Sequence, residues 1–137
     1  MRIAIINGPN LNLLGKRETD IYGNKSFEDF LVELKNKFPN VSFSYFQSNI
    51  EGELINELQR VGYEVDGIIL NPGGYTHTSV AIGDAIAAIK SPVVEVHISN
   101  ISAREDFRKI SHVSGKAMGS IAGLGLKGYQ LAVSYFM

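Results

Sequence analysis

The chain of 137 residues contains no cysteine. This absence excludes disulfide bonds, a thiolate nucleophile and cysteine-ligated metal centres. Histidine is also scarce, since only His77, His97 and His112 occur and no two of them have the i, i+4 spacing of helical metal ligands. We therefore expect no bound metal. A chain without disulfides is the norm in a reducing cytoplasm, and we expect this protein to be cytoplasmic.

Long hydrophobic runs and an excess of one charge are missing too. No stretch approaches the ~20 apolar residues that a membrane-spanning helix needs, and the N-terminus has no signal-peptide core. The composition is 45% hydrophobic and 20% charged, with a formal net charge of −1. Such a balance is ordinary for globular proteins and gives no sign of nucleic-acid or membrane partners.

Repeats, linkers and low-complexity tracts are absent as well, so we expect one domain over residues 1–137. Strand and helix patterns alternate along it. Strands are predicted near 3–6, 41–46, 67–70, 93–96 and 120–122, with helices near 27–38, 50–61, 80–89 and 126–136 and a short helix at 103–108. This alternation predicts an α/β fold, a doubly wound five-stranded parallel sheet of order 2-1-3-4-5.

Polar signatures follow three of these strands. They are Asn7-Gly8-Pro9-Asn10-Leu11-Asn12, Asn71-Pro72-Gly73-Gly74-Tyr75-Thr76-His77 and His97-Ile98-Ser99-Asn100. In an open parallel sheet, ligands bind beyond the carboxyl ends of the strands. We therefore expect a small polar ligand at this edge, held by many hydrogen bonds.

Two residue pairs suggest acid–base chemistry there. Glu95 precedes His97 by two positions on the same side of a strand, so its carboxylate could orient the imidazole. For the histidines, a structural role outweighs metal binding, and acid–base or substrate-binding roles outweigh both. For Glu95 the alternative is a salt bridge with a neighbouring lysine or arginine.

The second pair lies in the segment 7–25, which at about nineteen residues is long for a strand-to-helix connection. We interpret it as a lid. Arg17 and Tyr22 stand in it, and a nearby guanidinium could help a phenol to ionise, which near neutrality requires lowering its pKa by about 3 units. A lone Tyr-Gly in a loop is more often a packing anchor, so this pair is only suggestive.

One motif is rejected. The run Gly123-Leu124-Gly125-Leu126-Lys127-Gly128 matches a dinucleotide-binding pattern, but too few residues follow it to supply the acidic residue that holds a ribose. We expect these glycines to permit close packing.

Together, the motifs resemble one family across nearly the whole chain. They are Asn7 to Gly15, Arg17-Glu18, Tyr22-Gly23, Asn71-Pro72-Gly73, Tyr75 to Ser79, Glu95 to Asn100, Arg104-Glu105 and Phe107-Arg108. The chain resembles the type II 3-dehydroquinate dehydratases, small enzymes with a flavodoxin-like fold. The resemblance implies a single catalytic domain, a lyase that dehydrates 3-dehydroquinate to 3-dehydroshikimate by anti elimination through an enolate. It would act without a cofactor, in the shikimate pathway of aromatic amino acid biosynthesis or in the quinate pathway.

The resemblance also implies roles for individual residues. Tyr22 would be the base that removes the C2 proton, Arg17 would favour its ionisation, and Asn12 would hold a water at the enolate oxygen. His97, supported by Glu95, would protonate the leaving hydroxyl. The substrate would be bound by Asn71, His77, Ile98, Ser99 and Arg108, with Asp84 reaching the site of a neighbouring subunit in a dodecamer of four trimers.

This chain departs from the family pattern at three places: Thr19, Gly74 and the run Lys109-Ile110-Ser111-His112. We expect the run to touch none of the proposed catalytic residues and His112 to be structural. Two rival classes of protein remain as alternatives. A signalling domain would need acidic residues after the first strand, where Asn7 and Asn10 stand instead, and a flavin or nucleotide binder would retain its ligand on purification.

Overall fold

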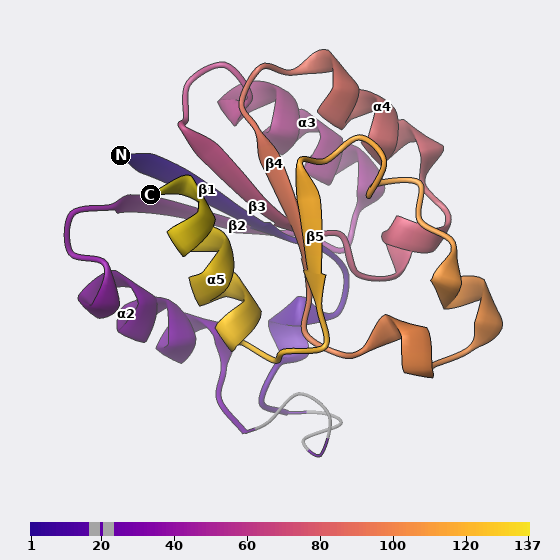
Figure 1. Cartoon of the computed structure of the whole chain (residues 1–137), viewed down its shortest axis with the longest axis horizontal. Coiled ribbons are helices and arrows are strands. Elements are labelled where there is room, and N and C mark those ends of the chain that lie inside the picture. Colours follow the sequence, from indigo (N-terminus) through magenta and orange to yellow (C-terminus); the bar gives the residue numbers. More distant parts are fainter. Residues whose placement is uncertain (17–19, 21–23) are drawn as a thin grey trace.

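Figure 1 shows the structure, a computed structural model that describes residues 1–16, 20 and 24–137. Its strands are β1 (Arg2–Asn7), β2 (Ser42–Gln47), β3 (Gly67–Asn71), β4 (Val93–His97) and β5 (Gly119–Ala122). They form one sheet of order β2-β1-β3-β4-β5, and every pairing is parallel. The predicted strand order and the flavodoxin-like doubly wound α/β architecture are confirmed.

Helices cover both faces of this sheet (Figure 1). Helices α2 (Phe27–Lys37) and α5 (Lys127–Phe136) pack on one face, where Phe27, Phe30 and Tyr129 meet the strands. Helices α3 (Glu51–Val61) and α4 (Val80–Ala88) pack on the other with a second apolar cluster. Strands β3 and β4 are buried along their whole length. Burial on both faces explains the apolar run Ile68–Leu70 in β3, whereas β4 also buries the polar side chains Glu95 and His97.

Serine side chains cap the N-termini of two of these helices, α2 and α4. Ser26 Oγ accepts a hydrogen bond from the Asp29 amide at 3.1 Å, and Ser79 Oγ accepts one from the Ile82 amide at 2.9 Å. Each satisfies a donor that would otherwise lack a partner in the first helical turn. Ser79 thereby fixes the start of α4 directly after the second polar signature.

One sequence prediction needs correction. The stretch 103–108 is not a continuous helix, because it runs from the end of one 3₁₀ turn, η3 (Ile101–Ala103), into a second, η4 (Asp106–Lys109). Arg104 and Glu105 lie between them in an extended conformation, which interrupts the helix. Two further 3₁₀ turns, η1 (Leu11–Leu13) and η2 (Gly73–His77), follow β1 and β3.

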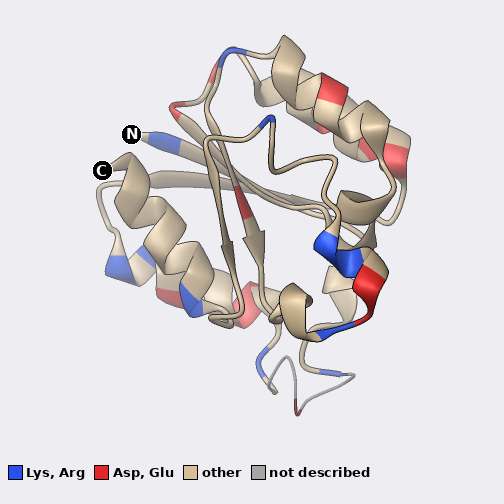
Figure 2. Ribbon diagram, turned by 45° about the vertical axis from the view of Figure 1, so that its right-hand side comes forward, with Lys and Arg blue, Asp and Glu red and all other residues tan. Residues whose placement is uncertain are grey.

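Charged residues lie mainly on the helices and connections around the sheet (Figure 2). Glu95 in β4 is the exception, because in the described part of the chain it is the one buried Asp, Glu, Lys or Arg side chain. Among the described helices none is long and apolar enough to cross a membrane.

Candidate active site

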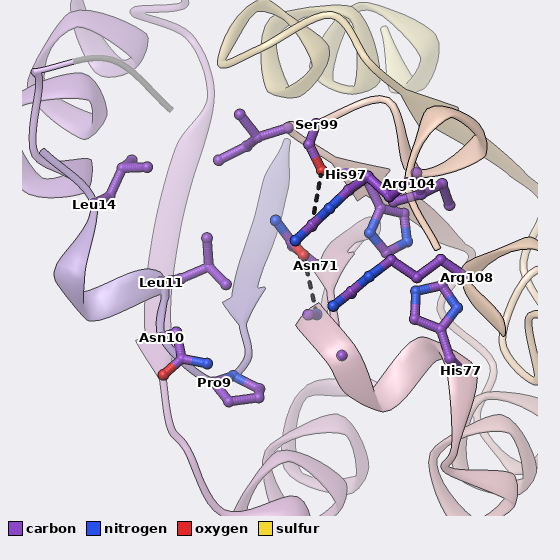
Figure 3. A pocket seen from close by; sticks show the side chains of 14 residues that line it. Pro9, Asn10, Leu11, Leu14, Asn71, His77, His97, Ser99, Arg104 and Arg108 are labelled. Atoms are coloured by element: carbon purple, nitrogen blue, oxygen red, sulfur yellow. Dashed lines mark hydrogen bonds between the residues drawn. The ribbon is translucent and has the colours of Figure 1, made fainter. Parts of the chain in front are cut away.

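A pocket of about 290 Å³ opens beyond the carboxyl ends of β1, β3 and β4, where the polar signatures were expected to meet. Figure 3 shows its walls, with the η1 side opposite the histidines and arginines. It is lined by Pro9, Asn10, Leu11, Leu14, Asn71, Gly73, Gly74, His77, His97, Ile98, Ser99, Ile101, Arg104 and Arg108. Two guanidinium groups and no carboxylate are among these lining residues, so the pocket suits an anionic, hydroxyl-rich ligand.

Asn71 is held from two sides. Its Oδ1 accepts a hydrogen bond from the Gly73 amide at 3.1 Å, and its Nδ2 donates to the Tyr129 hydroxyl at 3.0 Å. The Tyr129 hydroxyl donates in turn to Asn7 Oδ1 at 2.8 Å. Because Asn7 and Asn71 stand opposite each other on β1 and β3, one phenol from α5 orders both amides. Burial raises the pKa of Tyr129, which therefore remains a neutral donor.

Glu95 and His97 form a buried pair. His97 Nε2 lies 2.5 Å from Glu95 Oε2, and the Thr76 hydroxyl donates to the same oxygen at 2.8 Å. The Ser114 hydroxyl donates to the other oxygen, Oε1. Burial alone would raise the pKa of Glu95, but its bonds with His97, the attraction of that ring, and the Ser114 and Thr76 hydroxyls hold it below its ordinary value.

His77 stands beside this pair. Its ring centroid is 6.4 Å from that of His97, and its Nδ1 lies 2.7 Å from the carbonyl oxygen of Ile110. A carbonyl can only accept, so Nδ1 of His77 carries the proton. When the ring is neutral, Nε2 is therefore an acceptor suited to a substrate hydroxyl.

Arg104 and Arg108 extend toward the centre of the pocket (Figure 3). Arg104 Nη1 donates to Ser99 Oγ at 3.5 Å. Arg108 Nε donates to Glu105 Oε1 at 3.1 Å, and Arg104 Nε is 3.9 Å from the same oxygen. Glu105 therefore holds both arginines from outside the pocket.

The structure brings most of the sequence-predicted residues together. Asn71, His77, His97, Ile98, Ser99 and Arg108 line the pocket, and Glu95 lies directly behind His97. Asn12 is exposed beside Gln47, and it is not among the lining residues. Asp84 is exposed on α4. Arg17 and Tyr22 lie outside the described residues.

Four residues for which the sequence predicted no role also contribute: Thr76, Arg104, Ser114 and Tyr129. Thr76 and Arg104 lie within the motifs Tyr75 to Ser79 and Arg104-Glu105, so those motifs could have identified them. Ser114 and Tyr129 gave none, because a serine in a loop and a tyrosine on an apolar helix face are common everywhere. The segment 109–112 is also linked to the site, through Ile110 to His77 and through Ser111 and Ser114 to Glu95, which the sequence did not reveal.

Known proteins resemble this chain over its full length. The family model for class II dehydroquinases matches residues 1–137. A 3-dehydroquinate dehydratase of Fusobacterium nucleatum is 55% identical, covering 100% of this chain and 97% of that protein. The Bacillus licheniformis enzyme of the same name is 50% identical, with 98% and 94% covered.

Solved structures agree. The type II dehydroquinase of Butyrivibrio crossotus superposes with a TM-score of 0.92 at 46% identity, covering 99% of this chain and 97% of the other. That of Propionibacterium acnes gives a TM-score of 0.93 at 39% identity, with 98% and 94% covered. With a family match over every residue and such similarity in sequence and fold, this chain belongs to the class II dehydroquinase family.

Proposed function

We propose that this protein is a type II 3-dehydroquinate dehydratase, a hydro-lyase that converts 3-dehydroquinate to 3-dehydroshikimate and water in the shikimate pathway. The observation that carries this function is the buried Glu95–His97 pair at the wall of a pocket containing Arg104 and Arg108. The substrate is a carboxylate with ring hydroxyls and a ketone, so it needs cationic and amide donors together with one acid and one base. The pocket supplies the donors and the acid.

The base would be Tyr22, acting as a tyrosinate on the C2 proton. The ketone already acidifies that C–H bond, so a single strong base suffices when the enolate oxygen is also stabilised. Arg17 would favour ionisation of Tyr22, and Asn12 would hold a water at the enolate oxygen. These three assignments rest on the motifs that carry the family resemblance.

The acid would be His97. Its Nε2 faces Glu95, so Nδ1 is the nitrogen that can protonate the departing C1 hydroxyl. The Glu95 carboxylate, hydrogen-bonded to Nε2, stabilises the imidazolium before Nδ1 transfers its proton, and it fixes the orientation of the ring. Proton removal at C2 and proton delivery at C1 then occur from opposite faces of the substrate, as anti elimination requires.

Substrate binding would use the remaining lining groups. Asn71 and the backbone of Ile98 and Ser99 would bind the carboxylate and neighbouring oxygens, while His77 and Arg108 would bind ring hydroxyls. We infer that residues 1–137 form one cytoplasmic catalytic domain that needs no cofactor or metal. We also infer a dodecamer of four trimers, in which Asp84 on the surface of α4 would reach a neighbouring copy's site.

A direct assay tests the function. Purified protein mixed with 3-dehydroquinate should produce the ultraviolet absorbance of the conjugated enone of 3-dehydroshikimate. Treatment with borohydride in the presence of substrate should leave the activity intact, because the chain would form no Schiff base. No product from well-folded protein would refute the function, and bound flavin or nucleotide after purification would favour the rival binding class.

A further inference from the structure

The carboxylate of Glu95 is fully buried, with 0% of the residue exposed. An ionised carboxylate in such a place is costly unless several donors replace the lost water. Four lone-pair positions are available on its two oxygens. Donors from three different segments meet them: His97 at the end of β4, Thr76 in η2 and Ser114 after η4.

The hydrogen bonds around Ser111 have a single consistent direction. Its Oγ accepts the backbone N–H groups of Val113 at 3.1 Å and Ser114 at 2.9 Å, which uses both lone pairs of the hydroxyl. The Ser111 proton is then left to donate to Ser114 Oγ, 3.0 Å away. The single proton of Ser114 is thereby directed to Glu95 Oε1.

This arrangement fixes which carboxylate oxygen serves His97. Oε1 is committed to Ser114, and Oε2 receives both the Thr76 hydroxyl and His97 Nε2. An ionised carboxylate only accepts hydrogen bonds, so the proton between Glu95 and His97 comes from the imidazole. His97 therefore carries hydrogen on Nε2 in either charge state, and Nδ1 is the nitrogen that gains or loses the transferable proton.

We propose that Ser114, oriented by Ser111, is a positioning residue for the proton transfer by His97, because it holds Glu95 in one rotamer and one charge state. This inference rests on the proposed function for its kinetic consequences, but the hydrogen-bond relay does not. Ser114 is not among the residues that line the pocket. It acts through Glu95, so its removal should alter the chemical step more than substrate binding.

Other ionisable groups also face the pair. His77 lies on η2 with its ring 6.4 Å from that of His97, and Arg104 and Arg108 line the same pocket from the η3–η4 segment. Their hydrogen bonds to Ile110, Ser99 and Glu105 do not involve the Ser114 hydroxyl, so its removal leaves these bonds in place. A change in the pH profile of a Ser114 variant therefore reports on Glu95 and His97.

The test compares Ser114→Ala with Ser111→Ala and a matched control, Ser91→Ala. Ser91 is buried and donates to the Val65 carbonyl at 2.7 Å, just before β4 and at the opposite end of that strand from the pocket. For Ser114→Ala we expect kcat to fall about tenfold or more with KM changed less than about twofold. Glu95 loses one donor to its anionic form, so the step of the kcat profile that reports protonation of Glu95, on the acidic side of the limb set by the proposed base Tyr22, should move up by about one pH unit.

Ser111→Ala should change kcat and the pH profile in the same direction by a smaller amount, since Ser114 keeps its hydroxyl but loses its orientation. Ser91→Ala should lower the melting temperature without moving the pH profile. Nitrogen-15 spectra of imidazole-labelled protein give a readout independent of turnover. The wild type should show His97 protonated on Nε2, and both network variants should change the shifts of that ring.

Several results would overturn the inference. One is a folded Ser114→Ala protein with the kcat, pH profile and imidazole shifts of the wild type. Another is an equal loss of kcat in Ser91→Ala, which would indicate general destabilisation. If Ser114→Ala does not fold, unchanged His97 imidazole shifts in the Ser111→Ala spectra would overturn the inference instead. A wild type inactive on 3-dehydroquinate would refute the proposed function, whereas an active wild type with unaffected serine variants would refute only the relay.

Discussion

Tyr129 on α5 and Asn71 at the end of β3 share a buried hydrogen bond of 3.0 Å, although 58 positions separate them in the sequence. The same phenol donates to Asn7, so the closing helix of the chain orders polar groups at the ends of two central strands. Neither amide could be oriented this way by the strands alone. The C-terminal helix therefore contributes to the pocket without lining it.

Tyr129→Phe tests this relationship. The ring keeps its packing against Phe27 and Phe30, but Asn7 and Asn71 lose their shared partner. A buried polar group left without its partner costs about 1–3 kcal/mol, so the free energy of unfolding in urea should fall by that amount. KM should rise because the Asn71 amide is no longer fixed. Tyr135→Phe, at an exposed position of α5, serves as the control, and an equal effect there would contradict the assignment.

The fold was accessible from the sequence for a simple reason. Buried parallel strands read as apolar runs such as Ile3–Ile6 and Ile68–Leu70, and the helices between them repeat their apolar residues at helical spacing. The predicted sheet order followed from these alternations. The 3₁₀ turns at 101–109 were missed because their backbone depends on tertiary contacts and not on local periodicity.

The site was only partly accessible. Glu95 and His97 are two residues apart on one strand, so their pairing could be read from spacing. Thr76 and Ser114, each 19 positions from Glu95, meet it only when η2 and the segment after η4 fold against β4. Hydroxyl groups carry no periodic signal. The role of these two hydroxyls becomes clear only from the folded structure, where they supply hydrogen bonds to the buried Glu95 carboxylate.

Tyr22→Phe tests the proposed base. We expect kcat to fall by two to four orders of magnitude, since one positioned base contributes about 10²–10⁴-fold. The circular dichroism spectrum should be that of the wild type. Retention of more than about a tenth of the wild-type kcat would contradict the assignment of Tyr22 as the base.

Arg17→Ala tests whether Arg17 lowers the pKa of Tyr22. In this variant the base should titrate at higher pH, and an unchanged pH–rate profile would mean that Arg17 does not lower the pKa of Tyr22.

The buried Glu95 also predicts how stability depends on pH. The folded protein holds the pKa of Glu95 below its ordinary value of 4.5. Its contribution is therefore fully present above that value and is lost as the pH falls through the lower folded-state value. In Glu95→Gln this contribution is absent at every pH, so the stability gap between wild type and variant should narrow on acidification. Thermal melts between pH 3 and pH 7 measure the gap.

Glu64→Gln is the control for that measurement. The carboxylate of Glu64 is exposed and lies 4.0 Å from the guanidinium of Arg2, so its replacement should leave the acid-dependent loss of stability nearly as it is in the wild type. A constant gap for Glu95→Gln across the whole range would show that the carboxylate is not preferentially ionised in the folded state.

Two adjacent glycines of η2 should respond oppositely to alanine. Gly73 has φ +60°, and a Cβ there would lie 3.1 Å from the Pro9 carbonyl oxygen. Gly73→Ala should therefore cost about 1–2 kcal/mol from the left-handed backbone alone. A Cβ at Gly74 meets nothing within 4 Å, and its φ is not positive. Gly74→Ala should stabilise by about 0.4–1 kcal/mol by restricting the unfolded chain. Equal melting temperatures for the two variants would contradict this difference.

Assembly provides the last prediction, which concerns Asp84. Its side chain points away from the buried residues Ile82, Ala85 and Ile86 of α4 and is exposed in the single chain. If it meets Arg108 of a neighbouring copy, Asp84→Ala loses a charge-assisted hydrogen bond worth about 1.5–3 kcal/mol. Light scattering of the wild type should give a mass near twelve copies of the 15.0 kDa chain. The Asp84→Ala dodecamer should dissociate at a higher protein concentration than the wild type, and the variant should bind substrate more weakly. An active wild-type monomer at micromolar concentration, or a fully active Asp84→Ala dodecamer, would assign Asp84 to the solvated surface of the helix.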